Sequence, residues 1–241
     1  MKDLKGKVAL ITGASGGIGA AIAQRFAQDG IDLVLCGRSE EKLAATAELV
    51  KPYGIRAACC AVDLTMPDAP RRCIEAAIQV LGRLDILINN AGIALSCSFE
   101  QTTPEQFDTI MNTNVRAPYF LSQAALPLLR KSDHATIINI ASVVAHKGYP
   151  LQSAYAASKH ALLGMSKSLA NEVYSEGIRV HVIAPGAVFT DMVRVSRPDL
   201  SDEGMILPED IAEIAAFFAE HRTNAVVDEI EVHRAGKAPF A

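Results

Sequence analysis

The stretch Val8-Ala9-Leu10-Ile11-Thr12-Gly13-Ala14-Ser15-Gly16-Gly17-Ile18-Gly19 decides the fold of this chain. Its first four residues are continuously apolar, as in a strand that is buried on both faces. From Ile18 to Phe26 the apolar residues recur at helical spacing, so the glycines lie where a strand turns into the N-terminus of a helix. Glycines let the backbone approach a pyrophosphate, and the first N–H groups of the helix face it. The spacing GxxxGxG therefore predicts a phosphate-binding loop, and a tight turn without a ligand is the alternative.

The alternation of strand and helix continues along the whole chain. Further strands are predicted at Asp32–Cys36, Ala57–Val62, Ile86–Asn89, Thr136–Ile140, Arg179–Ile183 and Val226–Val232. Helices are predicted at Glu40–Val50, Ala69–Leu81, Pro104–Arg130 and Pro208–Glu220, and in the segment that carries Tyr155 and ends near Glu176. This order predicts an α/β fold, a Rossmann-type doubly wound parallel sheet of about seven strands flanked by helices on both faces. We expect a single domain over residues 1–241, with a polar substrate loop at about 191–207.

Composition excludes several classes of function. The chain has 241 residues, 50% of them hydrophobic and 21% charged, and a net charge of −4 without a block of basic residues. Nucleic acid and anionic membranes are therefore not expected partners. No apolar run reaches membrane-spanning length and no signal-peptide core is present, so we expect a cytoplasmic protein. The five cysteines are odd in number and lack CxxC spacing, which favours buried free thiols and no metal site.

The end of the second strand predicts which dinucleotide binds. Rossmann-type sites that prefer NAD place an acid there for the ribose 2′-hydroxyl, whereas a nearby Arg accommodates a 2′-phosphate. Here Gly37 takes the place of the acid, and Arg38 and Ser39 follow. Arg38 can offer a charged planar fork to a phosphate, so we predict NADP(H) rather than NAD(H). A solvated Arg at the start of a helix is the alternative.

Other polar residues follow strand ends. Asp63-Leu64 and Asn90-Ala91-Gly92 lie just past the third and fourth predicted strands, and Ser142 follows the fifth. Open α/β sheets bind ligands at this edge, although either of the first two segments could be only a turn. Asn114 lies among apolar residues of a long helix, where an Asn more often makes a structural hydrogen bond.

The stretch Ser153-Ala154-Tyr155-Ala156-Ala157-Ser158-Lys159 places a phenol and an ammonium one helical turn apart. Lowering a phenol pKa from about 10 to about 7 takes roughly 4 kcal/mol. One unit charge at ~4 Å and an effective dielectric of about 20 supplies that amount. We therefore expect Lys159 to make Tyr155 a working acid or base at neutral pH. By itself, such a pair is also typical of a half-buried ring beside a solvated charge.

These motifs, in this order and at these intervals, resemble the single-domain short-chain dehydrogenase/reductase family. The similarity runs from about Lys5 to Val232. The resemblance implies that Asn114, Ser142, Tyr155 and Lys159 form a catalytic tetrad. It also implies cofactor contacts from the Gly-rich loop, the strand ends, the two catalytic side chains and the segment after the sixth strand: Gly13, Ser15, Gly17, Ile18, Gly19, Arg38, Ser39, Asp63, Leu64, Asn90, Ala91, Gly92, Tyr155, Lys159, Pro185, Gly186, Val188 and Thr190.

The resemblance also implies the reaction, hydride transfer between the nicotinamide of NADP(H) and a carbonyl or secondary alcohol. Ser142 would hold the carbonyl oxygen, and Tyr155 would donate the proton. Lys159 would lower the phenol pKa and hold the nicotinamide ribose, and Asn114 would anchor a water chain. The implied partners are a small-molecule substrate and further copies of the chain, as a dimer or homotetramer. Val144, Tyr149, Gln152 and Val188 are expected to line a mixed, mostly apolar substrate pocket.

The chain departs from the family pattern at three places. His181 stands where an Asn is frequent, and we expect it to be a structural histidine. The last strand reads Asp228-Glu229-Ile230-Glu231-Val232 in place of the frequent Val-Asp-Gly-Gly end, so the subunit interface is not predicted. Carrier-protein-dependent reductases usually carry an Arg where Glu176 precedes Gly177. The absence of this Arg argues against a β-ketoacyl thioester reductase of fatty-acid synthesis, but Arg130-Lys131 keeps that function open as the alternative. A non-catalytic nucleotide-sensing protein is the second alternative.

Overall fold

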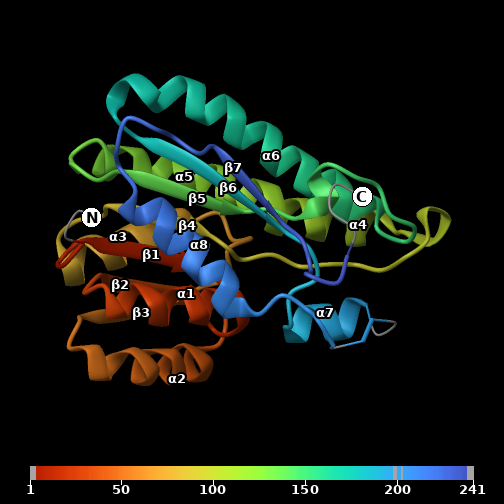
Figure 1. The fold of residues 1–241 in the computed structure, drawn as a ribbon, viewed down its shortest axis with the longest axis horizontal. Helices are drawn as coiled ribbons and strands as arrows, with labels where there is room; N and C mark the ends of the chain where they lie inside the picture. The colour runs from red at the N-terminus through yellow and green to blue at the C-terminus, as the bar shows by residue number, and fades with distance from the viewer. Residues whose placement is uncertain (1–3, 198–199, 202, 238–241) are drawn as a thin grey trace.

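Seven parallel strands form a single sheet in the computed structural model, which describes residues 4–197, 200–201 and 203–237 (Figure 1). The strands are β1 (Val8–Thr12), β2 (Asp32–Gly37), β3 (Ala57–Ala61), β4 (Ile86–Asn89), β5 (Thr136–Ile140), β6 (Arg179–Pro185) and β7 (Glu229–Val232). Their order in the sheet is β3-β2-β1-β4-β5-β6-β7. The chain reverses its direction of travel across the sheet between β3 and β4, so the carboxyl ends of β1 and β4 meet at a switch point.

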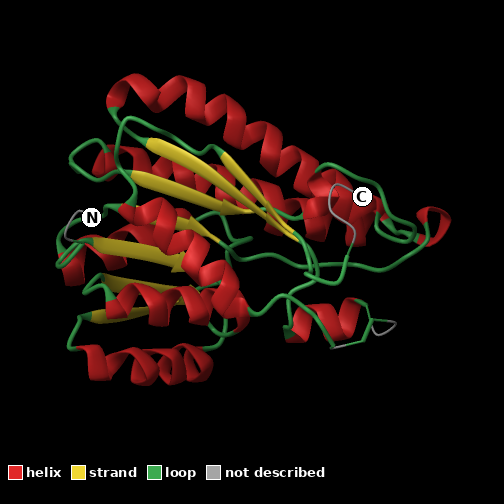
Figure 2. Cartoon of the chain, viewed as in Figure 1, coloured by secondary structure: helices red, strands yellow, loops and turns green. Residues whose placement is uncertain are grey.

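Helices cover both faces of this sheet (Figure 2). They are α1 (Gly17–Gln28), α2 (Glu40–Val50), α3 (Ala69–Leu81), α4 (Pro104–Met111), α5 (Ala117–Leu129), α6 (Ser153–Val173), α7 (Asp191–Ser196) and α8 (Pro208–Glu220). Side chains of α1, α2 and α8 pack on one face in a core that contains Phe26, Ile22 and Phe218. Side chains of α3, α5 and α6 pack on the other, around Leu121 and Val173. The predicted doubly wound parallel sheet is confirmed.

The buried strands explain why the site lies at one edge. Every residue of β1 and of β5 is buried, so neither strand can carry polar side chains into solvent along its length. The chain becomes polar where these strands end, and those ends point in one direction because the sheet is parallel. In Figure 1, α7 lies on the side to which the strand arrows point. None of the helices within the described residues is long and apolar enough to cross a membrane.

Most predicted strand and helix boundaries agree with the structure to within two residues, and three regions differ in another way. The helix predicted over Pro104–Arg130 contains a π-helical turn at Asn112–Arg116. The last strand starts at Glu229 rather than Val226, because its pairing with β6 begins at Val182 opposite Glu229. The segment after Thr190 is not all loop: the Thr190 side chain caps the short helix α7 by accepting a hydrogen bond from the Val193 N–H.

Three of the five cysteines meet in the core. Cys36 on β2, Cys60 on β3 and Cys73 on α3 are buried, and their sulfur atoms lie within 4.8 Å of one another. They are free thiols in an apolar layer, as the sequence predicts. Cys59 is exposed, because neighbouring residues of a strand point to opposite faces of the sheet.

Candidate functional site

The Gly-rich loop folds tightly against the end of β4. Gly13 has φ of +67°, and a Cβ there would lie 2.8 Å from the Asn90 Nδ2 atom. A Cβ on Gly19 would lie 2.2 Å from the Gly13 carbonyl oxygen. The Asn90 amide fills the space by donating hydrogen bonds to the carbonyl oxygens of Thr12 at 2.9 Å and Gly13 at 3.3 Å. Only glycine fits at these two positions, and Asn90 braces the loop through its amide nitrogen.

The same loop offers unused hydrogen-bond donors. The Ser15 hydroxyl is buried and has no hydrogen-bond partner among the described residues. Helix α1 begins beside it at Gly17, and no side chain caps its first N–H groups. A buried hydroxyl and an uncapped helix N-terminus fit a phosphate, which accepts hydrogen bonds from both. The loop therefore fits the pyrophosphate of a dinucleotide.

A cleft of about 390 Å³ extends from this loop along the carboxyl edge of the sheet. Most of the predicted cofactor residues line it: Gly13, Ser15, Gly17, Ile18, Arg38, Asn90, Ala91, Gly92, Tyr155, Lys159, Pro185, Gly186, Val188 and Thr190. Four predicted contacts are not among the residues that line the cleft. Gly19 packs under the loop, and Ser39 caps α2 by accepting from the Lys42 N–H at 3.3 Å. Asp63 accepts two hydrogen bonds from Thr65, and Leu64 packs against the core.

Lys42 also lines this cleft, and the sequence analysis missed it. It lies in the first turn of α2, and Arg38, just before the N-cap residue Ser39, lines the same cleft.

Tyr155, Lys159 and Ser142 converge at the inner end of the cleft. Lys159 is buried, and its ammonium group donates to the Ile140 carbonyl at 2.8 Å. Its nitrogen lies 5.8 Å from the centre of the Tyr155 ring. The Ser142 hydroxyl donates to the Pro185 carbonyl at 3.2 Å and also forms a hydrogen bond with the Tyr155 phenol. The predicted convergence of hydroxyl, phenol and ammonium is present.

Asn114 reaches the same place from the π-helical turn. Its Oδ1 accepts from the Ile93 N–H at 2.8 Å, and its Nδ2 donates to the Ile93 carbonyl at 2.9 Å and to the Ser158 hydroxyl at 3.0 Å. Asn114 thus ties the segment after β4 to α6. A Cβ on Gly92 would lie 3.2 Å from the Asn114 Oδ1 atom and 3.7 Å from the Lys159 ammonium nitrogen. A glycine at 92 lets both polar groups approach the backbone.

The pKa values differ from the sequence prediction. Burial raises the pKa of Tyr155 to about 12, and the hydrogen bond with Ser142 opposes this only in part. Burial lowers the pKa of Lys159 to about 8. The prediction that Lys159 brings the phenol pKa to neutral pH is therefore wrong for the protein without cofactor. The cost of taking the phenolate out of water outweighs the ammonium charge, which is directed at the Ile140 carbonyl.

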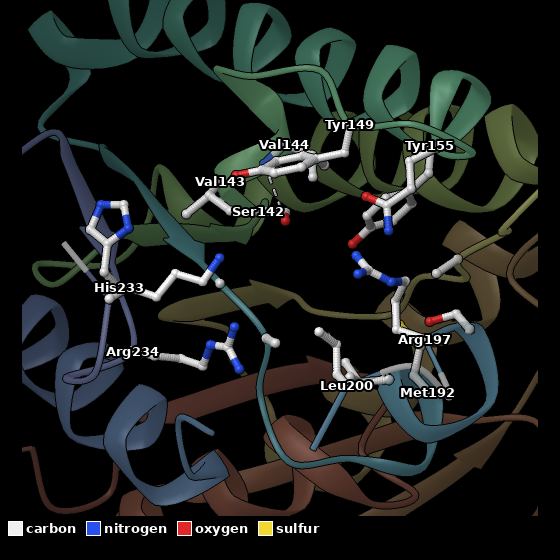
Figure 3. A pocket seen from close by; sticks show the side chains of 17 residues that line it. Ser142, Val143, Val144, Tyr149, Tyr155, Met192, Arg197, Leu200, His233 and Arg234 are labelled. Carbon is white, nitrogen blue, oxygen red and sulfur yellow. Dashed lines mark hydrogen bonds between the residues drawn. The ribbon is translucent and has the colours of Figure 1, made fainter. Parts of the chain in front are cut away.

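A second cavity of about 480 Å³ adjoins the cleft (Figure 3). The two share five lining residues, which are Ser142, Tyr155, Gly186, Met192 and Val193. Val144, Tyr149 and Gln152 line this second cavity as predicted, whereas Val188 lines the cofactor cleft instead, because it pairs with Ile206 at the base of the α7 segment.

The second cavity is less apolar than the sequence analysis expected. Arg197, His233, Arg234 and Lys237 also line it, and none of them was predicted. The run His233-Arg234-Ala235-Gly236-Lys237 after the last strand was the signal for three of these residues. It could not be used, because nothing in the sequence indicates that this segment turns back toward Ser142.

Comparisons with known proteins agree with this geometry. The short chain dehydrogenase family profile matches residues 7–201. Over 236 residues the chain is 36% identical to a 3-oxoacyl-(acyl-carrier-protein) reductase, FabG, of Rickettsia conorii, and the match covers 94% of each protein.

Two solved structures share the fold over nearly the whole chain. The short chain dehydrogenase from Mycobacterium paratuberculosis bound to NAD has 31% identity and a TM-score of 0.86, and the match covers 96% of this chain and 97% of that one. A metagenomic short-chain oxidoreductase in complex with NADP has 32% identity and a TM-score of 0.84, with 96% and 98% covered. The parallel sheet, the cleft at its carboxyl edge and these matches together place the chain in the short-chain dehydrogenase/reductase family of oxidoreductases.

Proposed function

We propose that this protein is an NADP(H)-dependent reductase of ketones, and of the corresponding alcohols in reverse. The observation that carries the proposal is the meeting of two cavities at Ser142 and Tyr155. One cavity contains the phosphate-binding loop and Lys159, and the other is closed on one side by α7. A substrate in the second cavity would therefore present its carbonyl group to the hydroxyl and phenol that border the first.

Each residue has a role that follows from its contacts. Bound NADPH supplies the hydride. Ser142 holds the carbonyl oxygen, and Tyr155, whose high pKa keeps it protonated at neutral pH, donates the proton. Lys159 holds the nicotinamide ribose from the floor of the cleft. Asn114 uses one lone pair of its Oδ1 on Ile93, and the second can hold a water that returns the proton.

The test of this assignment is Tyr155→Phe. Loss of the proton donor should lower turnover by about 10²- to 10⁴-fold while NADPH still binds, because the ring and its packing remain. Ketone-dependent NADPH oxidation measures turnover, and quenching or enhancement of NADPH fluorescence measures binding. Tyr149→Phe removes the other phenol of the substrate cavity and should cost less than about tenfold. Equal losses in the two variants would contradict the role of Tyr155.

NADP(H) is favoured by the charges at the adenosine end of the cleft. Arg38 is exposed there, Lys42 lines the same wall, and Gly37 stands where an acid would select NAD. Removing a charged hydrogen bond to phosphate costs about 1.5–3 kcal/mol. Arg38→Leu should therefore raise the KM for NADPH by about 10- to 100-fold and leave the KM for NADH nearly unchanged. A parallel loss with both cofactors would contradict the preference.

The alternative of β-ketoacyl thioester reduction is favoured by the relatives named as acyl-carrier-protein reductases. One contact speaks against docking of a carrier protein. Arg130 forms a two-pronged ion pair with Glu176, with N–O distances of 2.7 Å and 3.1 Å. Arg130, one of the two cations that could attract an acidic carrier, is thus paired with the chain's own carboxylate. A nucleotide-sensing role would require NADPH binding without turnover of any ketone. The fluorescence and NADPH-oxidation assays described for Tyr155→Phe measure both properties in the wild type.

We further propose a cytoplasmic homo-oligomer, a dimer or tetramer. Phe107 on α4 and Tyr119 and Phe120 on α5 are exposed large side chains, and such groups are enriched at subunit interfaces. Light scattering coupled to size exclusion measures the mass in solution. A monomer at micromolar concentration would contradict this part of the proposal.

A further inference from the structure

The cavity beside Tyr155 is lined by positive charge. Its charged side chains are Arg197, Arg234 and Lys237, and none of its lining residues within the described part of the chain is Asp or Glu. These cations come from two distant segments: Arg197 follows α7, and the other two follow β7. Figure 3 shows Arg197 and Arg234 entering the cavity from opposite sides, with Tyr155 above them.

This charge is unusual for the molecule. The protein has a net charge of −4, and several of its other arginines pair with carboxylates, as Arg83 does with Asp85 at 2.7 Å. Within the described residues, neither Arg234 nor Lys237 forms an ion pair with an acid. The nearby acids of β7 contact histidines rather than Arg234 or Lys237: Glu229 lies 2.6 Å from His146, and Glu231 lies 3.5 Å from His233. Arg234 and Lys237 therefore place like charges in one cavity, and a bound anion removes the cost of their repulsion.

The rest of the lining limits the size and shape of the anion. Val143, Val144, Met192 and Leu200 are apolar, and the volume of about 480 Å³ suits a small molecule. Ser142 and Tyr155 line the same cavity, so a molecule held by the cations lies beside the proposed carbonyl site. The anionic group and the reacting carbon can therefore belong to one substrate.

We propose that the substrate is a small ketone, or the matching alcohol, that carries its own carboxylate or phosphate. Arg234 and Lys237 bind the anionic group, and Arg197 completes the site from the α7 segment. Guanidinium groups bind both anions through paired hydrogen bonds, so the geometry fits either one. This inference rests on the proposed reductase function and goes beyond it by naming the substrate class.

The experiment compares matched pairs of ketones that differ only in charge. Acetoacetate and levulinate are each compared with their methyl esters, and dihydroxyacetone phosphate with dihydroxyacetone, by NADPH oxidation. The carboxylate pairs and the phosphate pair identify which anion is bound. Wild type should have a kcat/KM at least about tenfold higher for the charged member of the preferred pair. Arg234→Gln and Lys237→Gln should each lower kcat/KM for that member by about 10- to 100-fold and affect the neutral member much less.

Arg71→Gln is the control, because Arg71 is an exposed arginine of α3 outside both cavities. Arg71→Gln should leave kcat/KM unchanged for both the charged and the neutral ketone of each pair. Equal efficiency with charged and neutral ketones, or equal losses on both in Arg234→Gln, would overturn the inference and leave the reductase function standing.

Calorimetry measures anion binding independently of ketone turnover. Glutarate and glycerol 3-phosphate, which carry no ketone, are titrated into the NADPH-loaded enzyme. Binding of either that weakens at least about tenfold in Arg234→Gln supports the anion site even if no ketone of the panel is reduced, in which case only the reductase proposal fails. Binding that is absent, or unchanged in the variant, overturns the anion site.

Discussion

Tyr155 is the residue whose surroundings matter most for the chemistry. Burial raises its pKa to about 12, so the phenol stays protonated throughout the neutral range and is ready to donate. We expect that without cofactor the difference in phenolate absorbance between wild type and Tyr155→Phe does not titrate below pH of about 10. Saturation with NADP⁺ should bring this titration to lower pH, because the oxidised ring is cationic and favours the phenolate. A titration near neutral pH in the free protein would contradict the buried environment.

The sequence predicts the identity of this group better than its behaviour. The spacing of Tyr155 and Lys159 is local, and a helix places both on one face whatever lies around them. The pKa depends instead on what covers the ring and where the ammonium points. Lys159 donates to Ile140, a residue of β5, and that contact depends on how α6 docks on the sheet. Tertiary packing of this kind is not encoded in the heptapeptide.

Among the elements, the end of β2 and the Gly-rich loop constrain each other. A Cβ on Gly37 would lie 2.3 Å from the Ser15 hydroxyl oxygen but 3.6 Å from the Ser15 Cβ. Gly37→Ala should therefore leave the protein folded and force the hydroxyl to rotate away from its present position. We expect the KM for NADPH to rise by about tenfold, since one hydrogen bond to phosphate is lost.

A double-mutant cycle tests this coupling. Ser15→Ala removes the same hydroxyl and should raise the KM by a similar factor. The double variant should then be no worse than Ser15→Ala alone, because the added methyl group meets the Ser15 Cβ at 3.6 Å and, at 3.3 Å, only the mobile end of the Leu43 side chain. Additive losses in the cycle would show that Gly37 acts on the cofactor by another route.

At the scale of helices and strands, the sequence predicts one part of the site and not another. The loop after β1 carries a strong local signal, because its glycines, the preceding apolar strand and the following helix are contiguous. No local sequence pattern of this kind marks the cations that line the second cavity. Arg197 and Arg234 are far apart in sequence, and both line the cavity because the chain folds back on itself, as in the pairing of Val188 with Ile206 at the two ends of the α7 segment.

For the whole molecule, a parallel sheet with helices on both faces follows from general rules once the alternation of strands and helices is known. Parallel strands with right-handed crossovers and buried faces leave few arrangements, and the doubly wound sheet is one of them. The expectation that His181 in β6 is a structural histidine is confirmed, although the sequence alone could not name its contacts. Its ring stacks on Phe218 of α8 at a centroid distance of 4.3 Å, and its Nδ1 bonds to the Val227 carbonyl at 2.7 Å. His181 thus joins β6, α8 and the approach to β7.

The free energy of unfolding should depend on the protonation of this buried histidine. Burial lowers the pKa of His181 to about 4, below the value near 6.5 in the unfolded chain, so the native state resists protonation. Between these two pKa values the unfolded state binds more protons, and stability must therefore fall as pH falls from about 6.5 toward 4. The loss is roughly 2 to 3 kcal/mol, measured as the free energy of unfolding in urea at pH of about 7 and about 4.5.

The variant His181→Asn isolates this effect from other acid-sensitive groups. It removes the titrating ring and keeps an N–H donor for Val227, so it should be less stable than wild type at neutral pH but lose less stability on acidification. His160→Asn, at an exposed position on α6, controls for the loss of one histidine and should retain the wild-type pH dependence. If His181→Asn and wild type lost stability in parallel between the two pH values, His181 would not be the group that couples the fold to pH.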